Sequence, residues 1–156
     1  MQESIHLADA LNQLLPMDRD AAISYEQAAR WENFLDFKAR WLNFQRDHEN
    51  HIQNLKTAIE ELEGVPQSLE PPLSKLFFND NFVSILSPCS TETILRALFS
   101  NEEYSNYLYE SVLKESLPEN VRRLLSQHRE EEREHLAYLE SALKSVPQRE
   151  LKIMGQ

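Results

Sequence analysis

Two short stretches of similar sequence decide how this chain folds: His48–His51 reads HENH, and Glu132–His135 reads EREH. They start 84 residues apart (132 − 48). Residues three apart are neighbours on one face of a helix, so each stretch directs its first and last side chains to the same side. The pattern therefore predicts two equivalent helices, each presenting a pair of polar side chains.

The offset of 84 residues extends well beyond these two stretches. In each half an acid is followed seven residues later by a tyrosine, and then by the polar pair. A repeat of this kind predicts two helical hairpins related by an approximate two-fold axis, with equivalent positions meeting at the centre. The matched positions are Asp18 and Glu102, Tyr25 and Tyr109, His48 and Glu132, and His51 and His135, with Leu11, Leu14, Leu55 and Ala58 matching Leu95, Leu98, Leu139 and Ala142.

Glycine and proline divide the chain into the two halves. The segment 64–72 (GVPQSLEPP) begins with Gly64, which suits the C′ position at the end of a helix, and contains three prolines. Pro118 suits the first position of a new helix. We expect one all-α domain, with a first hairpin over about 4–63, a long crossover over about 64–89 and a second hairpin over about 90–146. Pro16 predicts a kink or a short preceding helix. The crossover is apolar, which predicts that it packs across the bundle and could include a short helix; its apolar residues are Phe77, Phe78, Phe82, Ile85 and Leu86.

The composition restricts the classes of function. The formal charge of −10 argues against nucleic acid and anionic membranes as partners, because both bind basic surfaces. A single cysteine, Cys89, excludes an intramolecular disulfide and a thiolate cluster, and no nucleophilic constellation surrounds it. We see no signal peptide and no apolar run long enough to span a membrane, so a cytoplasmic location is expected.

A polar layer interrupts the apolar seam of every predicted helix. In the last helix, for example, Leu125 and Leu139 flank the polar positions. Buried carboxylates are unfavourable unless a partner compensates their charge, and two divalent cations would compensate this layer well. Imidazole and carboxylate together favour iron, manganese or zinc over calcium or magnesium. The predicted metal ligands are Asp18, His48, His51, Glu102, Glu132 and His135.

These residues resemble the ferritin-like superfamily of four-helix bundles, which includes ferritins and rubrerythrins, and read most like its small bacterial members. In that family two helices each contribute a Glu and two contribute Glu-x-x-His. Glu102 and Glu132–His135 match this pattern, whereas Asp18 is a shorter acid and His48 replaces a bridging Glu. The resemblance implies a dinuclear centre, with iron most favoured, and oxidation chemistry such as ferroxidase or peroxide-consuming activity.

Several positions around the predicted ligands have more than one interpretation. We expect Tyr25 and Tyr109 to lie just outside the metal ligands, where they fill the core and hydrogen-bond the polar layer. His128 is expected to lie just outside the ligands as well, the alternatives being an extra ligand or a plain core residue. If the register of the first helix differs, Asp20 replaces Asp18. We interpret the neighbouring acids as solvated side chains or ion-pair partners; they are Asp47, Glu103, Glu131 and Glu134.

Two functional hypotheses follow from this pattern. The first is a dinuclear iron or manganese protein. The second is a metal-free relative, in which the same residues form a buried hydrogen-bonded layer and the bundle serves as a structural or dimerising module. The His48 substitution motivates the second hypothesis, since imidazole does not bridge as a carboxylate does. In both cases a homodimer or small homo-oligomer is expected, with Trp31 a candidate contact residue.

Overall fold

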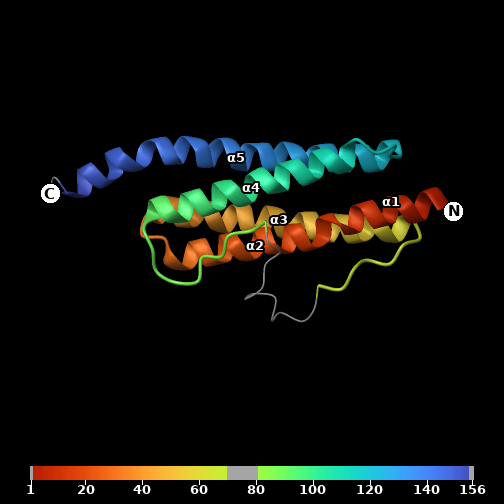
Figure 1. The fold of residues 1–156 in the computed structure, drawn as a ribbon, viewed down its shortest axis with the longest axis horizontal. Helices are drawn as coiled ribbons and strands as arrows, with labels where there is room; N and C mark the ends of the chain where they lie inside the picture. Colours follow the sequence, from red (N-terminus) through yellow and green to blue (C-terminus); the bar gives the residue numbers. More distant parts are fainter. Residues whose placement is uncertain (1, 70–80, 155–156) are drawn as a thin grey trace.

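The computed structural model describes the backbone of residues 2–69 and 81–154, and these residues form helices and loops without a strand. The prediction of an all-helical bundle is therefore confirmed. The chain makes one long arm from two consecutive helices and three further arms from single helices (Figure 1). The helices are α1 (Gln2–Asn12), α2 (Leu14–Trp31), α3 (Leu35–Glu61), α4 (Thr91–Leu113) and α5 (Glu119–Met154).

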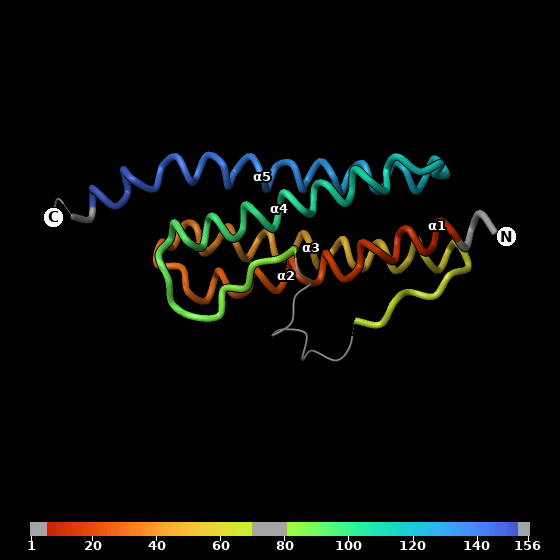
Figure 2. Tube along the Cα trace, in the orientation of Figure 1, coloured from red at the N-terminus to blue at the C-terminus, as the bar shows by residue number. Residues whose placement is uncertain are grey.

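The helices pair into two antiparallel hairpins. The arm formed by α1 and α2 packs against α3, and α4 packs against α5 (Figure 2). Contacts of α2 with α4 and of α3 with α5 join the hairpins. Both α3 and α4 run in the same direction, since α3 ends near the N-terminus and α4 begins at the opposite end of the bundle (Figure 1).

The first arm is interrupted shortly before its proline. The α-helix stops at Asn12 and resumes at Leu14, which places Pro16 in the first turn of α2. N–H groups in the first turn of a helix have no intrahelical acceptor, so a proline, which has no N–H, is tolerated there. This is the short preceding helix that the sequence predicted.

The end of α3 corrects the expected role of Gly64. Glu63, not the glycine, adopts the left-handed conformation, with φ of 62°. Gly64 N–H donates to Ile59 O at 2.9 Å, and Glu63 N–H donates to Glu60 O at 2.9 Å, which is the Schellman pattern. Gly64 is required for a different reason: an added Cβ would lie 2.5 Å from the Cβ of Ala8 in α1.

The described residues between α3 and α4 lie partly against the bundle. Phe82 and Ile85 are buried, and Leu86 is exposed. Ile85 N–H donates to the side-chain oxygen of Gln27 at 2.9 Å, which attaches this segment to α2. Residues 65–69 and 81–90 contain no helix, while Phe77 and Phe78 lie outside the described residues.

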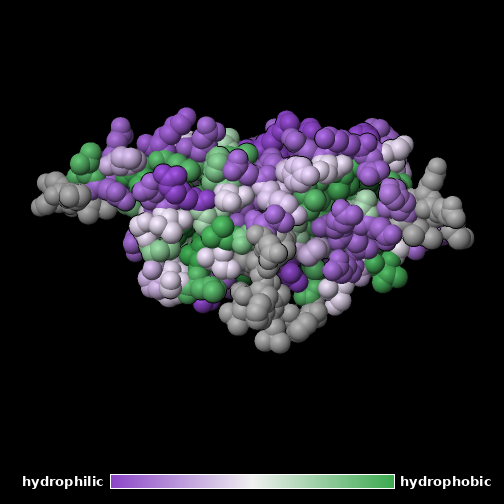
Figure 3. All heavy atoms as spheres, in the orientation of Figure 1, coloured by the Kyte–Doolittle hydropathy of each residue, from purple (hydrophilic) through white to green (hydrophobic). Residues whose placement is uncertain are grey.

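Two apolar clusters fill the bundle on either side of the polar layer. One includes Leu11 and Leu125 near the α1 end, and the other includes Leu95 and Leu139 near the far end. α5 continues through Pro147 to Met154, beyond the end at residue 146 expected for the second hairpin. On the face in Figure 3, hydrophilic residues cover much of the edge formed by α5, whereas hydrophobic residues form separate patches. Among the described residues, no helix is long and apolar enough to cross a membrane.

Candidate metal centre

The six predicted ligand residues lie together in the middle of the bundle. Each of the four arms contributes at least one of them, and every one of the six is at most 1% exposed. They form two overlapping groups in which the donor atoms all lie within 4.8 Å of one another. The first group is Asp18, His48, His51 and Glu132, and the second is His48, Glu102, Glu132 and His135.

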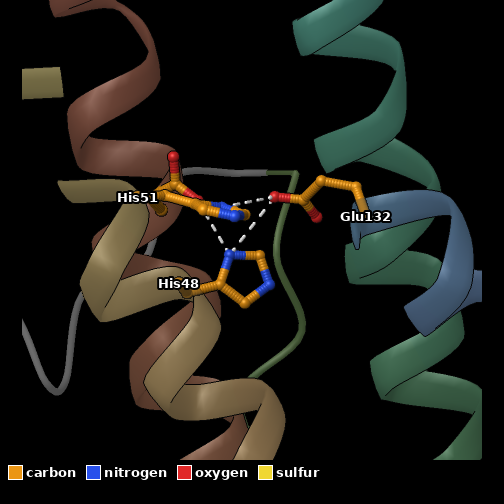
Figure 4. Close-up of side chains that lie close together, drawn as sticks. His48, His51 and Glu132 are labelled. Carbon is orange, nitrogen blue, oxygen red and sulfur yellow. Dashed lines mark hydrogen bonds and ion pairs between the residues drawn. The ribbon is translucent and has the colours of Figure 1, made fainter. Parts of the chain in front are cut away.

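The first group converges from α2, α3 and α5. Figure 4 shows three of its members, with the rings of His48 and His51 beside Glu132. His48 Nδ1 and His51 Nδ1 lie 2.7 and 3.3 Å from Asp18 Oδ1. The same two nitrogens each lie 3.4 Å from Glu132 Oε1. For metal–ligand bonds of about 2.0–2.1 Å, neighbouring donors in a tetrahedral shell are about 3.3 Å apart. The spacing of this group thus fits a single small cation.

The second group is built around Glu102 in α4. His48 Nε2 lies 2.9 Å from Glu102 Oε1, and His135 Nδ1 lies 3.0 Å from the same oxygen. His48 therefore presents one ring nitrogen to each group. Glu132 also belongs to both groups, so one histidine and one carboxylate are shared between them.

Three carboxyl oxygens in this layer make no hydrogen bond of ordinary geometry among the described residues, although His48 and His51 approach one of them, Glu132 Oε1, to 3.4 Å. They are Glu102 Oε2 and both carboxylate oxygens of Glu132, all of them inaccessible to solvent. A buried acceptor without a donor is destabilising by about 1–3 kcal/mol, and more if it is charged. A cation could bind these unpartnered oxygens together with the neighbouring imidazole nitrogens, and it would compensate the missing hydrogen bonds.

Each tyrosine of the repeat donates to the acid of the other hairpin. Tyr25 O–H donates to Glu102 Oε1 at 2.7 Å, and Tyr109 O–H donates to Asp18 Oδ2 at 2.6 Å. Both tyrosines are fully buried, and burial followed by the adjacent carboxylate raises the pKa of each phenol well above 10. The tyrosines therefore remain protonated donors that position the two acids.

His128 lies beside the first group without joining it. Its ring stacks on that of His51, with centroids 4.0 Å apart, and its Nδ1 lies 3.1 Å from the Tyr109 oxygen. Burial and the neighbouring His51 lower the pKa of His128 to about 3, so this imidazole is neutral. It contacts Tyr109 and His51, and its place just outside bound metal ions stays a prediction.

Two half-exposed acids complete the layer, and the sequence reasoning assigned them no part in the site. Asp47 Oδ2 lies 2.8 Å from His135 Nε2, and Glu131 Oε2 lies 3.5 Å from His51 Nε2. The second distance is longer than an ordinary hydrogen bond, which leaves His51 Nε2 unsatisfied. Asp47 and Glu131 are themselves 84 residues apart, so the repeat contained the signal that identifies them.

Burial and mutual charge shift the titration of the whole layer. Burial acts to raise the pKa of Asp18, but hydrogen bonds with His48 and His51 outweigh it and hold that pKa below its usual range. The pKa of Glu102 is lowered in the same way by His135 and His48, against the effect of burial. For Glu132, burial and the charge of Glu102 raise the pKa to about 8.

The histidines respond in the opposite direction. Burial would lower their pKa values, but the carboxylates dominate. The hydrogen bond with Asp18 and the nearby carboxylate of Glu131 raise the pKa of His51 to about 12, and Glu102 and Asp47 raise that of His135 to about 9. The carboxylates likewise raise the pKa of His48 well above 6.5. In a chain without metal, protons on these rings compensate the buried acids.

The remaining sequence candidates lie outside the cluster. Asp20 is buried, but Arg19 donates to it at 2.9 Å, so Asp18 and not Asp20 faces the polar layer. Glu103 and Glu134 are exposed, in line with their interpretation as solvated acids. Burial and the charge of Glu32 raise the pKa of the Cys89 thiol, which makes it a poor nucleophile. Trp31 is half-buried and packs against the second apolar cluster.

No protein-family model matches the chain, and a search of curated proteins finds no match to it. The geometry of the polar layer is thus the basis for any functional assignment.

Proposed function

We propose that this chain is a ferritin-like metal-binding protein that holds two divalent cations side by side in the core of its bundle. The observation that carries the proposal is the buried set of unpartnered oxygens on Glu102 and Glu132, which lie among three imidazoles. Hydrogen-bond donors would satisfy such oxygens in a purely structural layer. Cations satisfy them without any further side chain.

The residues divide between the two proposed ions according to the two groups. Asp18 and His51 would bind one ion, Glu102 and His135 would bind the other, and His48 and Glu132 lie between them. Mixed imidazole and carboxylate ligands favour iron, manganese or zinc. Bound iron or manganese would supply redox chemistry of the kind that ferroxidases and peroxide-consuming proteins use. The protein's own part is to orient the ligands through Tyr25, Tyr109 and Asp47 and to exclude bulk water.

The arrangement of the helices supports the ferritin-like part of the proposal. α3 and α4 run in the same direction, so α3 ends and α4 begins at opposite ends of the bundle, as expected for the one-crossover topology of ferritin-like folds. The reciprocal bonds Tyr25–Glu102 and Tyr109–Asp18 are what a two-fold relation between the hairpins would produce. Under such a relation, a residue and the residue 84 positions later make equivalent contacts, here a hydrogen bond from a tyrosine to the acid of the other hairpin.

The test is the metal content of protein purified without chelator, expressed as ions per chain. A value near two that is lost in the double variant His51→Ala/His135→Ala would support the proposal. His6→Ala is the matched control, because His6 is 67% exposed, lies beside Glu115 and belongs to neither group of ligands. No bound metal, even after anaerobic loading with ferrous iron, would refute the dinuclear centre.

A second candidate function rests on a different observation. His48 lies within hydrogen-bond distance of Asp18 through Nδ1 and of Glu102 through Nε2, so an imidazolium could donate to both acids without metal. In that case the layer is structural and the bundle is a scaffold or dimerisation module. The metal analysis separates the two functions, since the scaffold would hold no ion under any loading condition.

A further inference from the structure

A basic groove lies on the outer side of the second hairpin, apart from the polar layer. It has a volume of ≈ 450 Å³ and is formed by the C-terminal end of α4 and the first half of α5. Four cationic side chains line it, whereas Glu110 is the one acid among its lining residues. The cations are Lys114, Arg122, Arg129 and Arg133.

Helical spacing and the turn before α5 bring these charges together. Arg122, Arg129 and Arg133 are 7 and 4 residues apart, which places them on one face of α5. Lys114 is the C-cap of α4 and reaches the same groove. The chain has 26 acidic residues and 16 Lys and Arg in total, so four cations facing a single acid is a local reversal of its overall charge.

The cations differ in how far the protein already satisfies them. Arg122 donates to Leu113 O at 3.0 Å and to Glu115 O at 2.9 Å, so it is held against the end of α4. Arg133 has only a 3.3 Å contact with Glu110. Arg129 is different, because its Nε is buried and has no hydrogen-bond partner among the described residues.

The side chain of Arg129 is half-buried and lines the groove, so its guanidinium can donate to a ligand oxygen there. We propose that this groove binds an oxyanion of the phosphate type, either as free phosphate or as the phosphate group of a small molecule. Arg129 supplies the central contact, because its planar fork matches two phosphate oxygens. Lys114 and Arg133 add charge at the rim. The groove and the net charge of −10 disfavour an extended polyanion such as a nucleic acid.

The proposal does not depend on the metal centre. None of the groove residues belongs to either metal-ligand group, and the groove lies beside α4 and α5 without a contribution from α2 or α3. Anion binding is therefore expected with or without metal in the core.

Isothermal titration of the full chain with inorganic phosphate, pyrophosphate and a simple phosphate monoester, at constant ionic strength, tests the proposal. We expect saturable binding of at least one of them, weakened at least tenfold by Arg129→Gln. Preference for the monoester would identify a phosphorylated small molecule as the ligand, and equal or tighter binding of phosphate would identify the free anion. Arg123→Gln is the control and should bind normally, because Arg123 is 77% exposed and lies near Glu119.

Lys114→Gln provides a second variant should Arg129→Gln fail to fold, because Lys114 is exposed at the end of α4. It should weaken binding in the same direction. The absence of saturable binding of all three probes, or equal binding by the two groove variants and the control, would overturn the proposal.

Discussion

Tyr109 and Asp18, which are 91 residues apart in the chain, are joined by a buried hydrogen bond of 2.6 Å between the tyrosine hydroxyl and Asp18 Oδ2. The bond connects α4 of the second hairpin to α2 of the first. It leaves Asp18 Oδ1, the oxygen nearest to His48 and His51, directed at the first group of donors. A single hydroxyl thus both joins the hairpins and orients a proposed ligand.

Removal of this hydroxyl should affect stability and metal binding together. Tyr109→Phe leaves a buried carboxylate oxygen without its donor, so we expect unfolding in urea to require about 1–3 kcal/mol less free energy. Metal affinity should fall by about 10- to 100-fold, as for other groups that orient ligands. Tyr107→Phe is the control, because Tyr107 is 63% exposed. An unchanged unfolding curve for Tyr109→Phe would contradict the role assigned to this bond.

Glu132→Gln should separate stability from metal binding. The pKa of Glu132 in the fold is raised to about 8 from 4.5, so between these values the folded chain holds a proton that the unfolded chain lacks. Stability therefore falls as pH rises through this window, and the neutral glutamine removes the loss. In chelator-treated protein we expect Glu132→Gln to be more stable at neutral pH by about 1–3 kcal/mol.

The same variant should lose the bound metal, because an amide offers one weaker oxygen in place of a shared carboxylate. Glu134→Gln, at an exposed position of α5, serves as the control for both measurements. Full metal content in Glu132→Gln would show that Glu132 is not a ligand.

His48→Glu should strengthen the proposed centre. His48 is the shared residue that faces both donor groups, and a carboxylate there can offer one oxygen to each ion. We expect more metal per chain and slower loss to a chelator than in the unmodified protein. His48→Gln has nearly the same size without the charge, and it should bind less metal. If both variants behave alike, charge and bridging at this position do not limit occupancy.

Metal binding should release protons and strengthen as pH rises. The pKa values of about 9 for His135 and about 12 for His51 mean that both rings are protonated at neutral pH in a chain without metal. A cation can bind only to the deprotonated rings, so apparent affinity increases with pH until these groups titrate. Calorimetry in buffers of different ionisation enthalpy should detect release of at least one proton per chain. Binding that is independent of buffer and pH would contradict this assignment.

The sequence by itself determined the helices, the division into two halves and the identity of the polar layer. Apolar seams with helical period leave few alternatives for which face of each helix is buried, and Asp18, His48 and Glu132 all lie where those seams placed them. Tyr25 and Tyr109, which the offset of 84 residues pairs, each donate to an acid of the other hairpin. Local periodicity carries this information because each helix has to bury the same face wherever it packs.

The tertiary structure alone decided which atoms meet. The docking of the two hairpins decides that Tyr109 contacts Asp18 while Tyr25 contacts Glu102. It also brings Asp47 and Glu131 close to histidines of the opposite hairpin. The packing of α5 leaves the Nε of Arg129 without a hydrogen bond among the described residues. The same is true of Gly64, whose role comes from the approach of α1 and not from its own helix end. Helical periodicity specifies which face of a helix is buried, to within about one turn. Hydrogen bonds and ion contacts are made or lost over about 1 Å. Only the packing of side chains from different helices fixes atomic positions that closely.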